Sequence, residues 1–325
     1  YGRLFASDTL EAGDVLTGRE ASLAAARRAL SGESAGRLRG VALVGLDGVG
    51  KGTLSAAIVR SRSWKAVRRY ALLQPATRAD VDVMFRDRTE GHLVVVSGFH
   101  WLVSLRPGGL SVLRRFVEGV MHDGGKNAFL VHADRLVWDY VKGVAPLEEA
   151  FPEVIDLAPM TAEELEAAML ARHALSGFGL DFERTVSAHG LLGRGRDRPH
   201  APYFRALHAA SGGLVRDALR LWLASVESVD EDARVVHVGA VPPAPLAALR
   251  GQPDEVLVRL YQVARQGWMD AEGQAYAFRV DRTGAEAQLS RLAHRGLLER
   301  DKQTYRIASH LRGPTYRVLA ERGWL

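Results

Sequence analysis

A glycine-rich segment holds the residues best placed to do chemistry. Residues 41–56 read VALVGLDGVGKGTLSA, which is an apolar run, a loop ending in Lys51 and the beginning of a helix. Gly45, Gly48 and Gly50 allow the backbone to curl, so that successive amide groups point at one anion while the helix adds its positive end. Lys51 then places a positive charge beside the β and γ phosphates of a nucleotide. These residues predict a phosphate loop that binds ATP or ADP.

The loop departs from the usual pattern at one position. Gly52 stands where a serine or threonine normally offers its hydroxyl to Mg²⁺, so we expect Thr53, the nearest substitute, to contact the metal ion. A glycine-rich turn with an incidental lysine is the alternative, but a strand before the loop and a helix after it favour nucleotide binding. The predicted nucleotide-binding residues of this segment are Gly45, Gly48, Val49, Gly50, Lys51, Gly52, Thr53 and Leu54.

A second apolar run, residues 92–101 (HLVVVSGFHW), bears on hydrolysis. In active P-loop ATPases such a strand ends in an aspartate that organises magnesium, commonly followed by a glutamate that polarises water. The two positions read Ser97 and Gly98 here, and these residues supply neither a negative charge nor a base. We therefore predict slow or absent hydrolysis. His100 is either a substitute group that polarises water or a packing residue of an aromatic strand end.

Arg216 is the other residue whose position suggests chemistry. Residues 211–220 (SGGLVRDALR) place a glycine pair before a helix, with Arg216 one turn into it. An arginine held there by a lid is able to reach the γ phosphate and report its presence. The alternative is a solvated arginine on an amphipathic helix.

The elements that position these residues follow from apolar periodicity. Short apolar runs alternate with helix-like stretches, which predicts a mostly parallel sheet covered by helices on both faces. From Thr161 the pattern becomes helical and opens with a capping box to Glu164, so a helical lid should follow the sheet. The predicted strands are 41–45, 69–74, 92–97, 127–132 and 153–157, with a lid loop at 192–202 and a proline-rich linker at 240–253.

The C-terminal residues have the pattern of a winged helix. Helices are expected at 254–267 and 283–298, followed by a short hairpin. The expected outward side chains could bind DNA, but acidic neighbours interrupt the positive field, so DNA and protein partners both stay open. The basic or polar set is Arg282, Gln288, Arg291, Arg295, Arg300, Lys302 and Arg306, and the acidic set is Asp281, Glu286, Glu299 and Asp301.

The composition of the chain limits its partners, its location and the chemistry that it can perform. The 325 residues are 47% hydrophobic and 25% charged, with a net charge of +5 that favours phosphate-bearing partners. No run reaches the roughly 20 apolar residues of a membrane span, and no secretory signal is visible, so we expect a cytoplasmic protein. The absence of cysteine excludes disulfides, thiolate metal sites and a cysteine nucleophile.

Taken together, these motifs resemble a known family. The segment Gly18-Arg19-Glu20 before the phosphate loop is similar to the GRE motif of AAA+ and STAND ATPases, and the other motifs follow in family order. The whole chain resembles the origin-recognition and STAND-like branch of AAA+ proteins. The resemblance implies an α/β P-loop NTPase of AAA+ type, a parallel αβα sandwich at 1–158, followed by a helical lid at 159–239 and a winged-helix domain at 240–325.

The resemblance also implies roles for individual residues. Lys51 would be the Walker A lysine, Asp134 or His132 the sensor that ends the fourth strand, and Arg216 the second sensor. Family members assemble and donate an arginine finger to the neighbouring subunit. The candidates for that finger are Arg114, Arg115 and Arg135.

Three functions are consistent with these features. The first is a nucleotide-controlled switch or assembly ATPase, in which ATP brings lid and neighbour together and the winged helix passes that state to DNA or a protein, with a homo-oligomer or protein partner expected. The second is a scaffold or DNA- or protein-binding adaptor that never hydrolyses its nucleotide. The third is a small-molecule phosphotransferase, because GKGT also occurs in nucleoside-monophosphate kinases.

Overall fold

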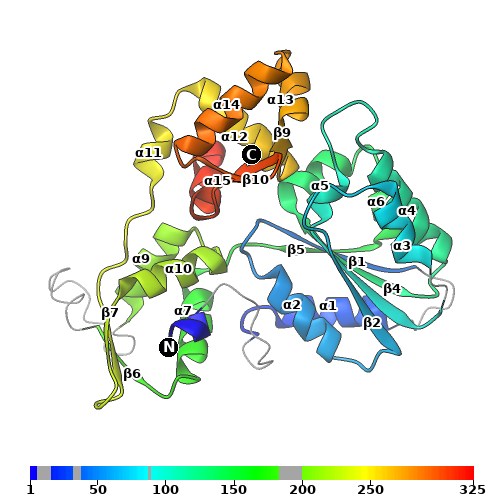
Figure 1. Cartoon of the computed structure of the whole chain (residues 1–325). Coiled ribbons are helices and arrows are strands. Elements are labelled where there is room, and N and C mark those ends of the chain that lie inside the picture. Colours follow the sequence, from blue (N-terminus) through cyan, green and yellow to red (C-terminus); the bar gives the residue numbers. More distant parts are fainter. Residues whose placement is uncertain (6–15, 32–37, 87–88, 183–199) are drawn as a thin grey trace.

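A five-stranded parallel sheet forms the centre of the N-terminal half (Figure 1). The computed structural model describes residues 1–5, 16–31, 38–86, 89–182 and 200–325. The strand order is β2-β3-β4-β1-β5, and all four pairings are parallel. The strands are β1 (Arg39–Gly45), β2 (Ala66–Ala71), β3 (His92–Ser97), β4 (Ala128–Asp134) and β5 (Glu153–Leu157). The predicted α/β fold with a parallel central sheet is confirmed, and β2 begins three residues earlier than expected.

Helices cover both faces of this sheet, as alternation along the strands requires. Val41 and Leu43 of β1 pack with α1 (Glu20–Leu30) and α2 (Lys51–Arg60). Ala42 and Val44 point to the opposite face. That face is covered by α3 (Arg78–Arg86), α4 (Ser111–Asp123), α5 (Arg135–Val141) and α6 (Leu147–Ala150). Burial on both faces explains why the inner strands β1, β3 and β4 read as continuous apolar runs, whereas the edge strands β2 and β5 carry charged residues.

The lid follows β5 and combines helices with a small sheet. Its helices are α7 (Ala162–Ala174), α9 (Ala201–Ser211) and α10 (Val215–Ser225), and α7 begins with the predicted capping box. Strands β6 (Gly179–Asp181), β8 (Val235–Val238) and β7 (Val226–Asp230) form a three-stranded sheet that the sequence analysis missed. The N-terminal turn Gly2–Phe5 packs into the lid core, where Phe5 stacks on Trp222 at 5.5 Å. Most of the predicted loop 192–202 lies outside the described residues.

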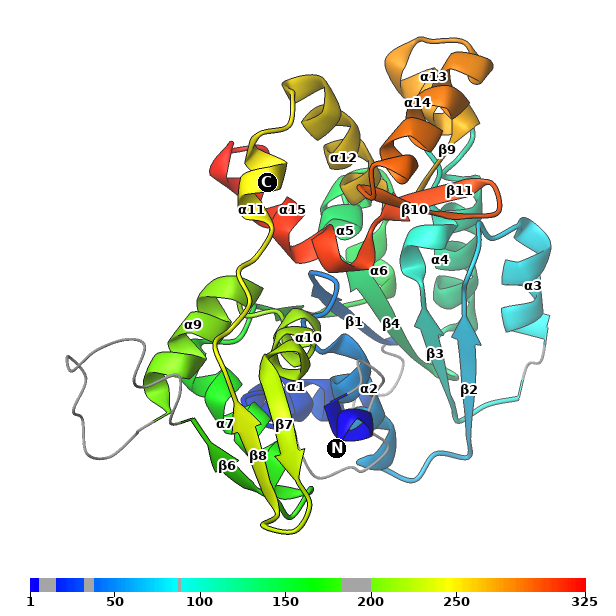
Figure 2. The same cartoon turned by 60° about the vertical axis from the view of Figure 1, so that its left-hand side comes forward.

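The C-terminal region contains the predicted helices and hairpin, together with the unpredicted elements α11, β9, α13 and α15 (Figure 2), and α11 lies within the predicted linker 240–253. Strand β9 pairs with β11 and completes a three-stranded antiparallel sheet, and α13 precedes the long helix α14. The elements are α11 (Leu246–Arg250), α12 (Asp254–Gln266), β9 (Met269–Asp270), α13 (Ala271–Phe278), α14 (Arg282–His294), β10 (Leu298–Asp301), β11 (Thr304–Ile307) and α15 (Arg312–Glu321).

This region packs directly on the phosphate-loop end of the central sheet. Leu46, Leu105 and Leu136, all from the N-terminal half, contact its apolar core. Trp268 is fully buried, its ring lies 5.3 Å from that of Trp101, and its indole nitrogen donates to the His100 carbonyl at 3.1 Å. The C-terminal region is therefore a wall of whatever site the loop forms. Across the described ranges, no helix has the length and apolar character needed to cross a bilayer.

Candidate nucleotide-binding site

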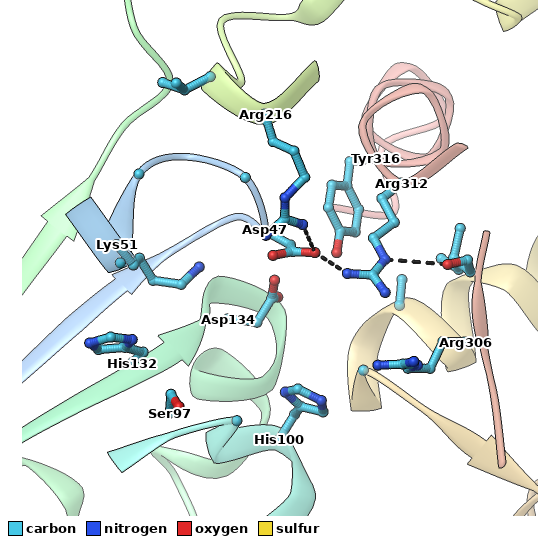
Figure 3. Close-up of a pocket in the computed structure, with 18 of the residues that line it drawn as sticks. Asp47, Lys51, Ser97, His100, His132, Asp134, Arg216, Arg306, Arg312 and Tyr316 are labelled. Carbon is cyan, nitrogen blue, oxygen red and sulfur yellow. Dashed lines mark hydrogen bonds and ion pairs between the residues drawn. The ribbon is translucent and has the colours of Figure 1, made fainter. Parts of the chain in front are cut away.

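A cavity of about 360 Å³ lies where β1, β3 and β4 end (Figure 3). Three parts of the chain line it: the phosphate loop with these strand ends, α7 and α10 of the lid, and α12, β11 and α15 of the C-terminal region. Carboxyl ends of parallel strands are where open α/β sheets bind their ligands. The cavity is thus at the place predicted for the nucleotide, but its C-terminal wall was not predicted.

The glycines of the loop adopt the backbone that the motif requires. Gly48 and Gly50 have φ values of +88° and +105°, and helix α2 begins at Lys51. The Lys51 ammonium donates to the Gly45 carbonyl at 2.6 Å and to the Leu46 carbonyl at 2.9 Å. Burial lowers the pKa of Lys51, although Asp134 and Asp47 oppose that shift. In this conformation the lysine side chain folds back on its own loop. A phosphate would accept a stronger hydrogen bond from its ammonium group than these neutral carbonyls do, because both groups would be charged.

The other predicted loop residues divide into two groups. Gly48, Gly50, Gly52 and Thr53 line the cavity together with Lys51. The Leu54 side chain lies instead in the core beneath the loop, and Val49 lines a neighbouring small cavity. That small cavity, of about 60 Å³, lies between the loop, α2 and the lid, and it shares Gly50, Thr53, Arg172, Val215 and Leu219 with the main one.

The GRE segment holds the loop to the end of the sheet. Arg19 donates to the Ala158 carbonyl at 2.6 Å and to the Val49 carbonyl at 3.4 Å. Gly18 has a φ of +73°, a conformation that L side chains rarely adopt. The segment therefore positions the phosphate loop and lines the small cavity.

A carboxylate in the loop brings two arginines together. Arg216 of α10 donates to Asp47 at 2.5 Å, and Arg312 of α15 donates to the same carboxylate oxygen. Arg312 also donates to the Ile307 carbonyl at 3.3 Å. Burial raises the pKa of the Asp47 carboxyl, but Arg312, Arg216 and Lys51 outweigh this effect and hold the pKa well below its usual range. Arg216 thus lies at the predicted site, whereas Asp47 and Arg312 are functional candidates that the sequence analysis missed.

The end of β3 carries no acidic residue, and the backbone conformation at Gly98 explains why a glutamate is missing there. Ser97 lines the cavity, while Gly98 has a φ of +77° and a backbone so close to that of Leu72 that a side chain would collide with it. A glutamate is therefore excluded at position 98. His100 lines the cavity, and its ring centroid lies 4.9 Å from that of Trp101. Both roles predicted for His100, contact with a ligand and packing, are therefore consistent with its position. Burial lowers the pKa of His100 to about 4, which keeps the imidazole neutral.

The end of β4 supplies the two predicted sensor candidates. Asp134 accepts a hydrogen bond from the Leu136 amide at 2.9 Å and caps α5. Burial raises the pKa of Asp134 to about 6, although Lys51 opposes the shift. The Nε2 atom of His132 is buried and makes no hydrogen bond within the described residues, and burial lowers the pKa of His132 to about 4. An unsatisfied buried nitrogen at a cavity wall is a group that a ligand can satisfy.

The carboxyl of Asp134 should make nucleotide affinity depend on pH. An anionic ligand further disfavours its charged form, so binding takes up a proton and affinity should fall as pH rises through about 6. Asp134→Asn keeps the cap and removes this titration. We expect a shallower pH dependence of ATP affinity in this variant, measured by calorimetry between about pH 5 and 8. Parallel pH profiles for both proteins would contradict this role, because the ionisation of ATP itself contributes equally to each.

The oxygen groups of the cavity do not fit the usual magnesium site of a phosphate loop. Ser97 and Gly52 replace the residues that normally hold the ion, and two arginines occupy the Asp47 carboxylate. Within the part of the chain that is described, no group of three or more His, Cys, Asp or Glu residues could hold a metal ion. The prediction that Thr53 binds Mg²⁺ therefore gains no support from its surroundings. The cationic residues that line the cavity and can balance phosphate charge are Lys51, Arg172, Arg216, Arg306 and Arg312.

The three candidate arginine fingers lie outside this cavity. Arg115 pairs with Asp82 at 2.8 Å, Arg135 pairs with Asp139 and Asp156, and Arg114 is exposed on α4. A finger acts on a neighbouring subunit, so these positions leave the choice among the three open.

Side chains expected on the outer surface of the C-terminal region differ in exposure. Gln288 is half-buried instead of fully outward, and its amide oxygen accepts from Arg259 at 3.2 Å and from Gln274 at 3.3 Å. Arg306 is half-buried and lines the cavity, 5.9 Å from the Trp101 ring. Arg300 is exposed but pairs with Glu286 at 2.9 Å. The other basic residues of the predicted set are exposed, namely Arg282, Arg291, Arg295 and Lys302.

Comparisons with known proteins find similarity of fold. No protein-family model matches the sequence, and no curated protein matches it. The Aeropyrum pernix ORC2 protein, solved in ADPNP and ADP complexes, has a TM-score of 0.49, 18% identity and 98% coverage of each chain. The Aeropyrum pernix ORC1 protein in complex with DNA has a TM-score of 0.48, 15% identity and coverage of 96% of this chain and 94% of that one. The Thermotoga maritima RuvB Holliday junction branch migration motor has a TM-score of 0.46, 16% identity and 99% coverage of each chain. The chain is therefore similar over nearly its whole length to solved ORC and RuvB structures.

Proposed function

We propose that this chain binds ATP or ADP at the phosphate loop and acts as a nucleotide-controlled switch with slow or no hydrolysis. The observation that supports this best is the composition of the cavity wall. Lys51 of the loop, Arg216 of the lid, and Arg306 and Arg312 of the C-terminal region all line one space. A phosphate bound there contacts three separate parts of the chain, so its presence changes how they are held together.

The missing acidic groups favour a switch over a motor. Ser97 supplies no charge, and the backbone at Gly98 excludes a glutamate. A site that retains its phosphate contacts but lacks a base hydrolyses a bound ATP slowly. The neutral imidazole of His100 is the remaining group at this strand end that could accept a proton from water.

Hydrogen exchange tests the switch directly. We expect ADP or ATP to change the amide protection of β11 and of α15 from Tyr316 onward, because Arg306 lies on β11 and Arg312 in the first turn of α15, while amides of α14 should stay unchanged. Equal exchange throughout the C-terminal region at saturating nucleotide would contradict a switch and favour a nucleotide-bound scaffold.

Ser97→Asp should raise the rate of ATP hydrolysis by at least about tenfold, because it restores the acidic group that active P-loop ATPases carry at this strand end. Ser97→Asn serves as the matched control, because an asparagine side chain has nearly the same size as an aspartate side chain but no charge. Steady-state phosphate release measures both. Equal rates in the two variants would mean that the missing carboxylate does not limit turnover.

An adaptor that binds DNA or protein through the C-terminal region is the second candidate. Arg282 and Arg291 are exposed on α14, and neither has an ion-pair partner among the described residues. Exposed arginines on one helix can hold phosphates. Loss of DNA binding in a charge-reversed Arg282→Glu/Arg291→Glu double variant, with unchanged ATP affinity, would support this role.

A further inference from the structure

Asp47 is an unusual residue for a loop that binds phosphates. The loop collects amide groups, Lys51 and a helix N-terminus around one space, and all of these favour an anion. A carboxylate placed in the same loop is itself an anion. Its side chain keeps 24% of its surface accessible and lines the cavity, so it is not hidden in the core.

The groups that face Asp47 come from every part of the site. Arg216 and Arg312 pair with it directly, and Lys51 lies close enough to stabilise its charge. Asp134 and the Tyr316 hydroxyl face the same space from β4 and α15 (Figure 3). Two of the cations that a terminal phosphate would use, Arg216 and Arg312, are thus already paired with a carboxylate of the protein.

We infer that Asp47 is a built-in counter-anion that holds Arg216 and Arg312 when no phosphate is bound, and that a nucleotide's terminal phosphate competes with it for these two arginines. The identity of the ligand as a nucleotide rests on the proposed function, whereas the ion pairs of Asp47 with Arg216 and Arg312 do not depend on it. It makes Asp47 the residue that determines how strongly each additional phosphate improves binding. It also makes Asp47 the residue that fastens the C-terminal region to the loop in the nucleotide-free protein.

Geometry supports a fastening role for the pair with Arg312. The contact joins residues that are 265 positions apart in the sequence, and Arg312 is the first residue of α15. The Nε atom of Arg312 also donates a hydrogen bond to the Ile307 carbonyl, which holds the guanidinium in place. On the lid side, the Arg216 amide donates to the Gly48 carbonyl at 3.0 Å, so α10 contacts the loop through its backbone as well. Removing the carboxylate should therefore loosen α15 more than α10.

The test compares Asp47→Asn with the wild type for a series of ligands: adenosine, AMP, ADP and ATP. Asparagine keeps the size and removes the charge, which leaves Lys51, Arg216 and Arg312 uncompensated. We expect affinity for ATP to rise by at least about tenfold, with smaller gains for ADP and AMP and none for adenosine. Equal gains for adenosine and ATP, or weaker ATP binding, would overturn the inference, because competition acts only on phosphates.

A second measurement uses no nucleotide. In Asp47→Asn, the amides of α15 from Tyr316 onward, which bond to the carbonyls of its first turn, should exchange at least about tenfold faster than in the wild type, and inorganic pyrophosphate should restore their protection. Asp134→Asn, which also removes a carboxylate from the cavity wall, should leave this protection unchanged. Arg312→Gln breaks the contact from the other side and should loosen α15 equally without strengthening ATP binding, which keeps the test decisive even if Asp47→Asn is poorly folded.

The outcomes separate this inference from the proposed function. If amides of α15 exchange faster in Asp47→Asn but the wild type binds no nucleotide, the counter-anion role of Asp47 stands and the proposed nucleotide switch is wrong. Unchanged exchange in both Asp47→Asn and Arg312→Gln would reject the counter-anion, whatever the wild type binds.

Discussion

Lys51→Ala should lower the affinity for ATP and ADP by at least about 100-fold. A hydrogen bond to a charged group contributes about 1.5–3 kcal/mol, and an ammonium beside two phosphates makes at least two. In the nucleotide-free protein the same ammonium only bonds the carbonyls of Gly45 and Leu46, which water can replace when the side chain is truncated. Calorimetric titration with each nucleotide measures the change.

Two controls make that result specific to the site. Lys65→Ala removes an exposed lysine outside the cavity and should leave ATP affinity unchanged. The circular dichroism spectrum and melting temperature of Lys51→Ala should stay close to those of the wild type, because α2 begins at this residue and alanine is a good helix former. Unchanged ATP affinity in a folded Lys51→Ala protein would refute the phosphate loop.

Trp268→Ala should destabilise the protein by about 3–5 kcal/mol, as expected when a fully buried aromatic side chain is truncated. The indole fills the junction between the C-terminal region and the end of β3, where it contacts Trp101 and donates to the His100 carbonyl. Its loss should also separate the two parts, so that chemical denaturation becomes biphasic. Urea unfolding followed by fluorescence and far-UV circular dichroism measures both effects.

Trp324→Ala provides the matched control on the same region. Trp324 packs on Tyr261 at 6.1 Å and is only partly buried, so its loss should cost far less and leave unfolding in a single step. A conservative Trp268→Phe variant should keep most of the stability but lose the hydrogen bond to His100. Equal destabilisation by Trp268→Ala and Trp324→Ala would contradict a special role for the junction.

Much of the fold could be predicted because its signals are local. The three inner strands of the central sheet, β1, β3 and β4, are short apolar runs, since burial on both faces leaves little room for polar residues. The lid sheet gave no such signal, because β7 (VESVD) is exposed along most of its length and carries polar residues. Strand β9 has only two residues, too few to show any alternation.

The candidate site divides in the same way. The loop glycines and Lys51 form one continuous motif, and the local pattern around Arg216 indicated a helix start, so these residues could be predicted. Arg312 and Tyr316 could not, because no local pattern reveals that α15 reaches a loop far away in the sequence. Asp47 was visible in the motif, and an acidic residue in a loop built for anions is a local conflict that indicates a cationic partner elsewhere.

Nucleotide binding at the phosphate loop and slow turnover of ATP can be measured together on the wild-type chain. Calorimetric titration with ATP and with ADP gives the affinities, and steady-state phosphate release at the same concentrations gives the turnover. We expect saturable binding of one nucleotide per chain with turnover far below the roughly 10 per second that is typical of enzymes. Brisk turnover would contradict the slow switch, and the absence of binding by either nucleotide would contradict the phosphate loop itself.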